Sequence, residues 1–424
     1  ASFEAVAREL TVMAAEEAGL NITLLEEPQA AFYSWLHENE ASWRDNLEAG
    51  QSLLVCDIGG GTSDFSLISV EEDAEGSLGL KRQAVGEHIL LGGDNMDMTL
   101  AYIAQRKLGQ KLDAKQMSSL VHACRQAKES LLIENGSEEE SLTVLGSGSS
   151  LIGGTLKATL TRDEVTQFIL NGFTANTPYD APLQRQTRGG LRSFSLNYET
   201  DTALTRHLAS FLRENVQGQF PTAVLFNGGV SKADILRDRI IENLEDWSGE
   251  KMQILTGTDP DLAVARGAAH FGYVKRGNAI RIKSGSIFSY YIGIESSMPA
   301  IPGFPPPTDA VCLLPSGAED GSSFEIPVDN LGLIVGEQSR FRFFASKDHP
   351  EHEIGTVVDE FSLEELVELP ALNSHLKDDN SADGSLVPIQ LHSALSDIGT
   401  VQVWCHETQG ERKWRLEFDL HEEA

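Results

Sequence analysis

The apolar residues of the chain follow two different repeats, which divide it into two parts. Up to about residue 279, stretches with apolar residues three or four positions apart alternate with short continuous apolar runs, which predicts helices alternating with buried strands. From Ile280 onward, apolar and polar residues alternate within short stretches, as is typical of half-buried strands. The pattern therefore predicts an α/β fold followed by a C-terminal, mainly β domain.

Within the first part, the helical repeat predicts amphipathic helices over residues 1–19, 29–40, 117–133, 162–173 and 202–217, and two more that begin near Asn95 and Ala233. Buried strands are expected around residues 53–57, 65–70 and 223–226. In the last third, residues 401–405 and 414–418 alternate on either side of a polar turn, which predicts a β-hairpin.

Composition narrows the possible partners. The 424 residues include 33 basic and 64 acidic side chains, a net charge of −31, so we expect no binding to nucleic acid or to an anionic membrane surface. No apolar run approaches the roughly 18 residues that a membrane-spanning helix needs. The four cysteines, Cys56, Cys124, Cys312 and Cys405, are far apart, which favours a reducing cytoplasm over a disulfide framework or a cysteine zinc site.

The stretch from Leu53 to Ile68 carries the clearest chemistry. It is a strand, a turn of three glycines (Gly59, Gly60 and Gly61) with Thr62, and a second strand. Because glycine leaves backbone N–H groups unshielded, phosphate oxygens can approach such a turn closely. Asp57 and Asp64 bracket the turn, and carboxylates beside phosphates require a cation, which predicts magnesium held mostly through water. A plain tight hairpin is the alternative.

No Gly-Lys-Ser/Thr follows these glycines and a strand takes the place of a helix, so this is not a mononucleotide P-loop. The arrangement resembles the second phosphate loop of the actin, hexokinase and heat-shock-chaperone ATPase superfamily. Three further stretches, Leu25–Ala31, His88–Asp97 and Val224–Lys232, fall in the order and spacing of DnaK-type 70-kDa heat-shock chaperones. The resemblance covers roughly residues 1 to 295 and implies actin-like (ribonuclease H-like) ATPase lobes that bind ATP or ADP with Mg²⁺.

The resemblance also implies roles for single residues. Asp57 would orient the attacking water, Thr62 would donate a hydrogen bond to the γ-phosphate, and Glu27 would lie beside the magnesium ion. Nucleotide contacts are expected from Gly59, Gly60, Gly61, Gly93, Asp94, Lys128, Gly228, Gly229 and Asp261, and metal contacts, mostly through water, from Asp57, Asp64 and Glu27.

Ordinary structural roles compete with several of these assignments. Glu27 would also suit the first turn of a helix through the helix dipole, and Asp261 would suit an N-cap. Gly92 and Gly93 would present bare N–H groups at a helix N-terminus, which is an anion site or a simple capped junction. Lys128 on a helix surface is also a candidate for a plain solvated charge.

The residues expected around the purine base and ribose differ from those of the family. Where the family places a glutamate, an arginine and a serine, this chain has Arg125, Glu129 and Leu132, and Val230 and Lys232 replace a serine and an arginine. The family's hydrogen-bond pattern to the base therefore does not carry over, which leaves nucleotide specificity open.

The resemblance predicts three domains: residues 1–56 as the remainder of a truncated first ATPase lobe, 57–279 as lobe two with an inserted subdomain at about 95–200, and 280–424 as a β domain related to a chaperone substrate-binding domain. Val55 and Leu225 are expected in two facing sheets of a pseudo-symmetric pair. Because the family's first phosphate loop and catalytic lysine are not found, we expect a piece of a longer protein that alone neither hydrolyses ATP nor binds it tightly.

The function implied is that of an Hsp70/DnaK-like chaperone homologue that binds and hydrolyses ATP when full length and binds unfolded polypeptides or partner proteins. Two alternatives are a nucleotide-sensing scaffold without hydrolysis and a small-molecule kinase of the same superfamily. Residues 177–199 form an insertion relative to the chaperones, and the only basic concentration of the chain, Arg185, Arg188, Arg192 and Arg206, lies in it or just beyond it. It is either a partner-docking loop or an ordered surface loop.

Overall fold

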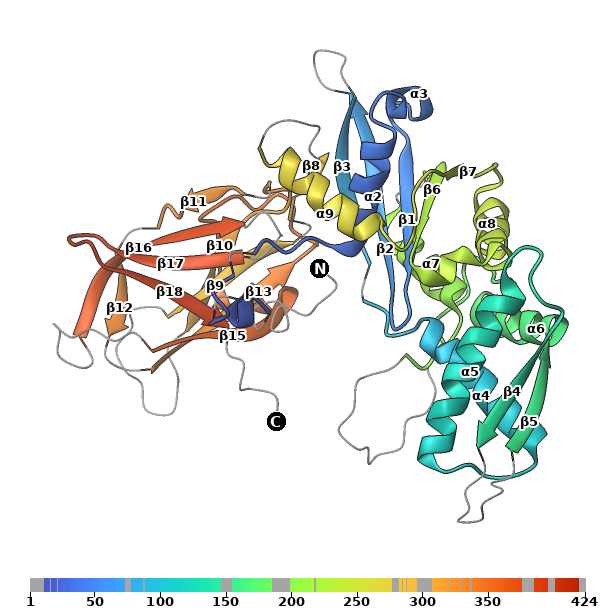
Figure 1. Cartoon of the computed structure of the whole chain (residues 1–424). Helices are drawn as coiled ribbons and strands as arrows, with labels where there is room; N and C mark the ends of the chain where they lie inside the picture. Colours follow the sequence, from blue (N-terminus) through green and yellow to red (C-terminus); the bar gives the residue numbers. More distant parts are fainter. Residues whose placement is uncertain are drawn as a thin grey trace. The chain divides into compact units, whose positions relative to one another are not determined.

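The chain forms two compact units, each described here by itself. The computed structural model describes residues 11–15, 17–20, 22–72, 78–86, 88–145, 155–184, 199–216, 219–276, 282–283, 285–286, 288–295, 307–319, 321–328, 330–335, 338–375, 385–395 and 401–418. Residues 26–282 make up one unit, and residues 283–424 make up the other together with the described residues before 26 (Figure 1).

The first unit is built on a six-stranded sheet with the strand order β7-β6-β1-β2-β3-β8. Its strands are β1 (Ser52–Ile58), β2 (Ser63–Glu72), β3 (Leu78–Val85), β6 (Ala223–Asn227), β7 (Gln253–Leu255) and β8 (Ile282–Lys283). Strand β1 pairs antiparallel with β2 and parallel with β6. All seven residues of β1 are buried, because this strand lies inside the sheet and both of its faces are covered.

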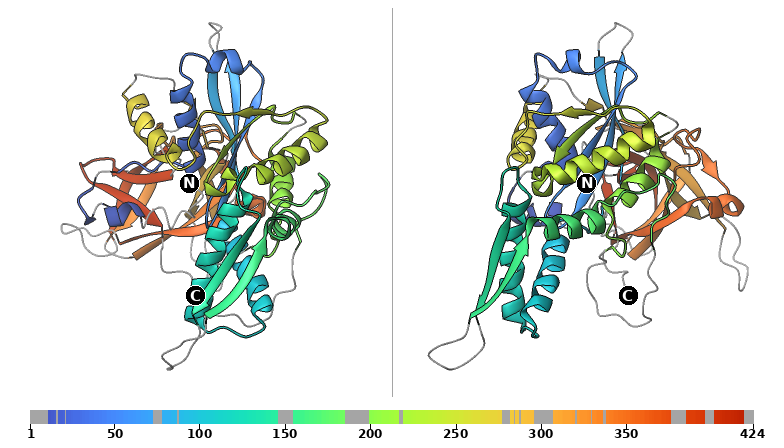
Figure 2. Two further views of the ribbon diagram at one scale, coloured as in Figure 1. Left: turned by 45° about the vertical axis from the view of Figure 1, so that its right-hand side comes forward. Right: turned by 90° about the vertical axis from the view of Figure 1, so that its right-hand side faces the viewer.

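Helices cover both faces of this sheet. They are α2 (Glu27–Glu38), α3 (Trp43–Asn46), α7 (Leu204–Asn215), the 3₁₀ turn η1 (Gly229–Lys232), α8 (Asp234–Ser248) and α9 (Ala263–Val274). Helices α2 and α9 lie side by side on one face (Figures 1 and 2). Leu54, Cys56 and Ile58 point to the opposite face and share a core with Leu208 and Phe211 of α7.

A smaller α/β substructure follows the sheet hairpin. It contains α4 (Gly93–Leu108), α5 (Ala114–Leu132), the antiparallel pair β4 (Glu139–Leu145) and β5 (Thr155–Thr161), and α6 (Arg162–Phe173). Helix α4 ends at Gly109, whose φ of 70° is the left-handed conformation that glycine adopts at helix ends. Helix α5 begins with a capping box in which the Asp113 carboxylate accepts from the Gln116 N–H.

Apart from helical residues among 11–17, the described part of the second unit consists of β-strands and one short 3₁₀ helix. Its sheet runs in the order β11-β16-β17-β18-β15-β13-β9-β10-β14, and β12 also pairs with β16. The elements are β9 (Ser289–Glu295), β10 (Thr308–Leu314), β11 (Ser323–Glu325), β12 (Leu331–Val335), β13 (Gln338–Ser346), β14 (Val357–Val358), η2 (Glu360–Glu365), β15 (Val367–His375), β16 (Ser385–Leu395), β17 (Val401–Glu407) and β18 (Lys413–Phe418). A separate apolar core around Ile292, Phe343 and Val403 holds it together.

The predicted α/β fold followed by a β-rich part is confirmed, as is the C-terminal hairpin, in which Val403 pairs with Leu416 and Cys405 with Trp414. The helix predicted at residues 162–173 has those bounds. The expectation that Val55 and Leu225 lie in two facing sheets is wrong, because β1 and β6 are neighbours in one sheet with these two residues opposite each other.

The predicted boundary between residues 56 and 57 falls inside β1, and residues 26–282 form one compact unit across it. The second unit begins at residue 283, close to the predicted start of the β domain at 280. The assignment of these units to the lobes of the ATPase family stays a prediction.

All four cysteines are buried and free of disulfide bonds. Cys56 and Cys124 lie in the first unit, and Cys312 and Cys405 lie in the second. Among the described helices, none is both long and apolar enough to cross a membrane.

Gly267 determines how closely α2 and α9 pack. A Cβ built on Gly267 would lie 1.7 Å from the Ala30 carbonyl oxygen, so only glycine fits between the two helix backbones at this point. Gly272 lies on the same helix, and a Cβ there would meet nothing within 4 Å. The two glycines thus have the same secondary structure and opposite packing environments.

We expect Gly267→Ala to destabilise the first unit by about 1–3 kcal/mol, because the helices must separate to admit the methyl group. Gly272→Ala should stabilise the unit by about 0.5–1 kcal/mol through the higher helix propensity of alanine. Hydrogen exchange of the α2 and α9 amides in both variants checks this, and equal protection in the two variants would contradict it.

Candidate functional site

The predicted glycine turn lies between β1 and β2. The Gly59 N–H donates to the Thr62 carbonyl oxygen at 2.8 Å and closes the turn. Within the described part of the chain, the N–H groups of Gly60, Gly61 and Thr62 donate no hydrogen bond. Three adjacent backbone donors are therefore left for an external acceptor, the arrangement that suits phosphate oxygens.

The N-terminus of α4 is joined directly to this turn. The Gly93 N–H donates to the Gly59 carbonyl oxygen at 3.0 Å, and the Asp94 N–H donates to the Gly60 carbonyl oxygen at 2.7 Å. The Gly92 N–H donates to the Asn95 side-chain oxygen at 3.0 Å. The expectation of bare N–H groups at Gly92 and Gly93 is therefore wrong, because the glycine turn and Asn95 accept from them.

Two glycines at this junction have no room for a side chain. A Cβ on Gly92 would lie 2.6 Å from the Gly60 carbonyl oxygen. Gly228 has a φ of +83°, and a Cβ there would lie 2.3 Å from the Ile58 carbonyl oxygen and 2.9 Å from the Asp57 carboxylate. Predicted residue Gly228 thus packs against the end of β1, where a larger residue would push the two strand ends apart.

Asp57 occupies the meeting point of β1 and β6. Its Cα pairs with that of Asn227, whose side-chain amide donates to the Asp57 carboxylate at 3.0 Å. Asp57 is only 4% exposed. Burial raises the pKa of the Asp57 carboxyl to about 6; the Asn227 hydrogen bond opposes the rise, and the negative charges of Glu27 and Asp64 add to it. Asp57 is thus ionised at neutral pH but sensitive to mild acid.

The two other predicted metal-site carboxylates lie in different surroundings. Asp64 pairs with Asp57 across the hairpin, is 5% exposed, and contacts the His88 ring nitrogen Nδ1 at 3.0 Å. Glu27 is the exposed first residue of α2, and its charge is one of those that raise the Asp57 pKa. Its neighbour Glu26 is bound to Arg82 at 2.9 Å, a structural ion pair.

A pocket of about 380 Å³ continues from the glycine turn. Of the predicted nucleotide contacts, Gly60, Gly93, Asp94, Lys128, Gly229 and Asp261 line it. The remaining lining residues are Met96, Asp97, Arg125, Glu129, Leu132, Ile133, Val230, Lys232, Ala233 and Leu236. Gly60 belongs to both the turn and the pocket. The predicted phosphate-binding and base-binding parts of the nucleotide site are therefore adjacent.

Charged side chains around the pocket are paired with one another. The buried Lys128 ammonium lies 2.6 Å from the Asp97 carboxylate and donates to the Gly93 carbonyl oxygen at 3.1 Å, so it is not a solvated surface charge. At the rim, Arg125 pairs with Glu129 at 3.1 Å, and Lys232 pairs with Asp261 at 2.5 Å. Exposed pairs of this kind contribute about 0–1 kcal/mol, so a ligand can rearrange them at low cost.

The residues present fit a nucleotide with a divalent cation. The three free N–H groups are suitable phosphate donors, and the carboxylates of Asp57, Asp64 and Glu27 are oxygen ligands of the kind that magnesium binds, often through water. The pocket volume lies within the usual range for small-molecule sites.

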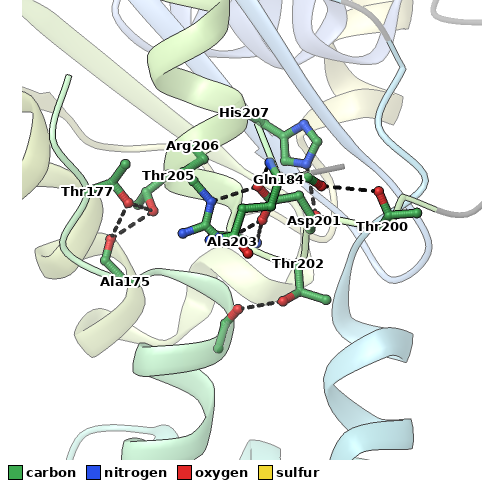
Figure 3. Close-up of polar contacts among 11 residues, drawn as sticks. Ala175, Thr177, Gln184, Thr200, Asp201, Thr202, Ala203, Thr205, Arg206 and His207 are labelled. Atoms are coloured by element: carbon green, nitrogen blue, oxygen red, sulfur yellow. Dashed lines mark hydrogen bonds and ion pairs between the residues drawn. The ribbon is translucent and has the colours of Figure 1, made fainter. Parts of the chain in front are cut away.

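The structure describes both ends of the predicted insertion, while residues 185–198 lie outside the described residues (Figure 3). The buried Asp201 carboxylate accepts from the Gln184 N–H at 2.8 Å and from the Arg206 guanidinium at 2.7 and 2.6 Å. Thr205 donates to the Ala175 carbonyl oxygen at 2.8 Å. Arg206 is therefore part of an internal ion pair and not of a basic docking surface.

Sequence reasoning missed three residues at this site. Asn227 donates to Asp57, His88 contacts Asp64, and Asp97 holds Lys128. All three lie inside the stretches that carry the family resemblance. Their position, from one to five residues away from the predicted glycines, is the sequence feature that could have identified them.

Comparisons with known sequences indicate which proteins the chain is similar to. A family model described as Hsp70 protein matches residues 1–177. A chaperone protein HscA homolog from Acinetobacter baumannii is 34% identical over 140 residues, 32% of this chain and 21% of the relative. HscA homologs from Vibrio cholerae and Ralstonia nicotianae are 30% and 28% identical over 282 and 280 residues, 66% of this chain in both cases. The matched stretches cover 21% to 37% of the relatives' own length.

The fold, an α/β unit followed by a β-rich unit, is consistent with an Hsp70-type ATPase lobe followed by a β-rich domain. Over residues 1–177 the chain matches the Hsp70 family of chaperones, and over 66% of its length it is similar to an HscA chaperone of that kind. That family generally binds ATP or ADP with Mg²⁺ and acts on client proteins.

The buried charge of Asp57 should appear in the stability of the first unit. Because the folded-state pKa is raised above the usual 3.8, protonation stabilises the fold below pH 4, and this contribution is lost as the pH rises through about 6. Asp57→Asn removes the charge, so the variant lacks this loss. Its free energy of unfolding minus that of wild type should therefore be about 1–2 kcal/mol higher at pH 8 than at pH 5. Urea unfolding at both pH values, with EDTA present, measures this.

A second variant tests whether the pH dependence of stability comes from the Asp57 charge and not from altered packing around the substituted side chain. Asn227→Ala removes the amide that lowers the Asp57 pKa, so the pH-dependent loss of stability should move to higher pH. If the free energy of unfolding differs between Asp57→Asn and wild type by the same amount at both pH values, the charge of Asp57 is not buried as assigned.

Proposed function

We propose that the intact protein binds ATP and ADP in the pocket beside the glycine turn and hydrolyses ATP there. The observation that carries this proposal is the set of three unpartnered N–H groups, Gly60 to Thr62, at the end of a pocket that Gly60 also lines. In this assignment the turn holds the phosphates, and the pocket between α5 and η1 holds the adenosine.

Each predicted residue then has a distinct task. Asp57, ionised above its pKa of about 6, accepts a hydrogen bond from the attacking water and orients it. Thr62 and the Gly60 and Gly61 amides donate to the terminal phosphate, where negative charge is stabilised by preorganised donors. A magnesium ion, when bound near Asp64 and Glu27, neutralises phosphate charge. Gly92 and Gly228 keep the backbones close enough for this geometry.

We propose further that nucleotide binding regulates the grip of the protein on unfolded polypeptides or partner proteins in the cytoplasm. The relatives are named chaperone proteins, and the buried, unbridged cysteines suit a reducing compartment. The second unit, a separate β-sheet structure, is the proposed binding part.

One observation favours a second function, a nucleotide-sensing scaffold without hydrolysis. The purine-side positions carry Arg125 and Glu129, which pair with each other, and Lys128 is held by Asp97. A nucleotide could then be bound for its effect on α4 and α5, since Lys128 and Gly93 connect these helices through one hydrogen bond.

Calorimetric titration of ATP and ADP onto the intact protein tests binding, and steady-state phosphate release tests hydrolysis. We expect Asp57→Asn to bind ATP but to hydrolyse it roughly 10²-fold or more slowly, because the neutral amide is a much weaker proton acceptor for the water than the carboxylate. Normal turnover in this variant would remove Asp57 from its role. Binding without turnover in the wild type would select the scaffold.

A pair of lysines provides a matched control for the position of the pocket. Lys232 pairs with Asp261 at the pocket rim, and Lys251 pairs with Glu245 away from it. Lys232→Ala should weaken nucleotide binding a few-fold, whereas Lys251→Ala should leave it unchanged. The reverse result would place the nucleotide elsewhere.

A further inference from the structure

The second unit contains a turn with two histidines and a carboxylate. Residues 349–352 read His-Pro-Glu-His and lie between β13 and β14. The His352 N–H donates to the His349 carbonyl oxygen at 3.3 Å, which closes a four-residue turn with proline at its second position. The turn places both histidine rings on the same side, stacked with centroids 4.7 Å apart.

One ligand atom from each of His349, Glu351 and His352 lies within 4.8 Å of the other two. The Glu351 carboxylate oxygen is 3.2 Å from His349 Nδ1 and 3.8 Å from His352 Nε2. Two ligands of a tetrahedral zinc ion, each about 2.0–2.1 Å from the metal, lie roughly 3.3 Å apart. The observed separations are thus close to those of ligands that share one ion.

The remaining nitrogen of each ring has a partner of its own. His349 Nε2 lies 3.4 Å from the Glu365 carboxylate at the end of η2. His352 Nδ1 lies 2.8 Å from the hydroxyl of Tyr291 on β9. A hydrogen bond such as that between Tyr291 and His352, or a carboxylate beside the ring as at Glu365, helps to fix the tautomer and the orientation of metal-binding imidazoles. These contacts leave His349 Nδ1 and His352 Nε2 for the position beside Glu351.

The supporting contacts come from the core of the unit. Tyr291 is fully buried, so its hydroxyl is held in place beside His352. Ser289, also buried, donates to the His349 carbonyl oxygen at 3.2 Å and accepts from the Ser316 N–H at 3.0 Å. The backbone of the turn is therefore held by β9 and by the segment after β10.

We propose that His349 Nδ1, Glu351 and His352 Nε2 bind a divalent transition-metal ion such as Zn²⁺, with the fourth position open to solvent. Two imidazoles and one carboxylate are a ligand set that suits zinc and its neighbours, whereas Mg²⁺ and Ca²⁺ prefer oxygen ligands alone. Glu351 is 65% exposed on its side chain, which gives an ion access from solvent. The proposal is independent of the nucleotide site, because all of its residues belong to the second unit.

A bound ion would connect parts of this unit that are separate along the chain. The turn follows β13, Glu365 ends η2, and Tyr291 belongs to β9. Because the ion would bind only when the turn is folded, it should stabilise the second unit and not the first.

The test uses the whole 424-residue chain, stripped with EDTA and dialysed. Calorimetric titration with ZnCl₂ should show one site, and Co²⁺ should give the visible d–d absorption of a low-symmetry nitrogen and oxygen site, whereas MgCl₂ should give no heat of binding. His352→Gln should lower zinc affinity by at least about 100-fold. Glu365→Gln, which removes only a supporting contact, should lower it by about 10–100-fold with unchanged stoichiometry.

A second histidine pair in the same unit serves as the matched control. His392 and His406 stack with centroids 3.9 Å apart on neighbouring strands. His406→Gln should leave zinc affinity unchanged. Loss of binding in His406→Gln with retention in His352→Gln would overturn the proposal, as would a wild-type chain that does not saturate below roughly 1 mM zinc. Far-UV circular dichroism of each variant verifies that the strands remain folded.

Discussion

The first unit depends on the two hydrogen bonds that join the N-terminus of α4 to the carbonyl groups of Gly59 and Gly60. A helix N-terminus must find acceptors for its first N–H groups, and here the glycine turn supplies them. Because the carbonyl groups of the turn are directed to the helix, its remaining N–H groups are left for another acceptor. The bonds also bring Gly92 so close to the turn that no side chain fits there.

The same junction explains why a charge is buried in the sheet. Parallel pairing of β1 with β6 brings Asp57 beside Asn227, and the antiparallel hairpin brings it beside Asp64. Burial and two negative neighbours raise its pKa, and the Asn227 hydrogen bond only partly opposes this rise, so the carboxylate is retained at a cost in stability. Natural proteins keep such groups mainly where chemistry needs them, which agrees with the role proposed for Asp57.

Local pattern was sufficient to predict elements whose periodicity is complete. Helix α6 and the β17–β18 hairpin are examples, because their apolar residues alone define which face is buried. Pairing between β1 and β6 was not predictable in this way, since Asp57 and Asn227 are 170 residues apart and no local repeat records such a contact. A solvated surface charge was the alternative to a nucleotide contact for Lys128, because its helix is amphipathic, yet Asp97 on a neighbouring helix makes its burial possible. The predicted glycines come together for a similar reason: the resemblance supplied their order, while the distances between them depend on the sheet.

The four buried cysteines provide each unit with thiols whose alkylation reports on local opening of the structure. Burial raises the pKa of every one of these thiols, so the reactive thiolate is scarce while the chain is folded. An alkylating reagent can therefore modify them only when the surrounding structure opens. Two of the thiols lie in each unit, so the order in which they react records which half of the molecule opens first, without any added probe.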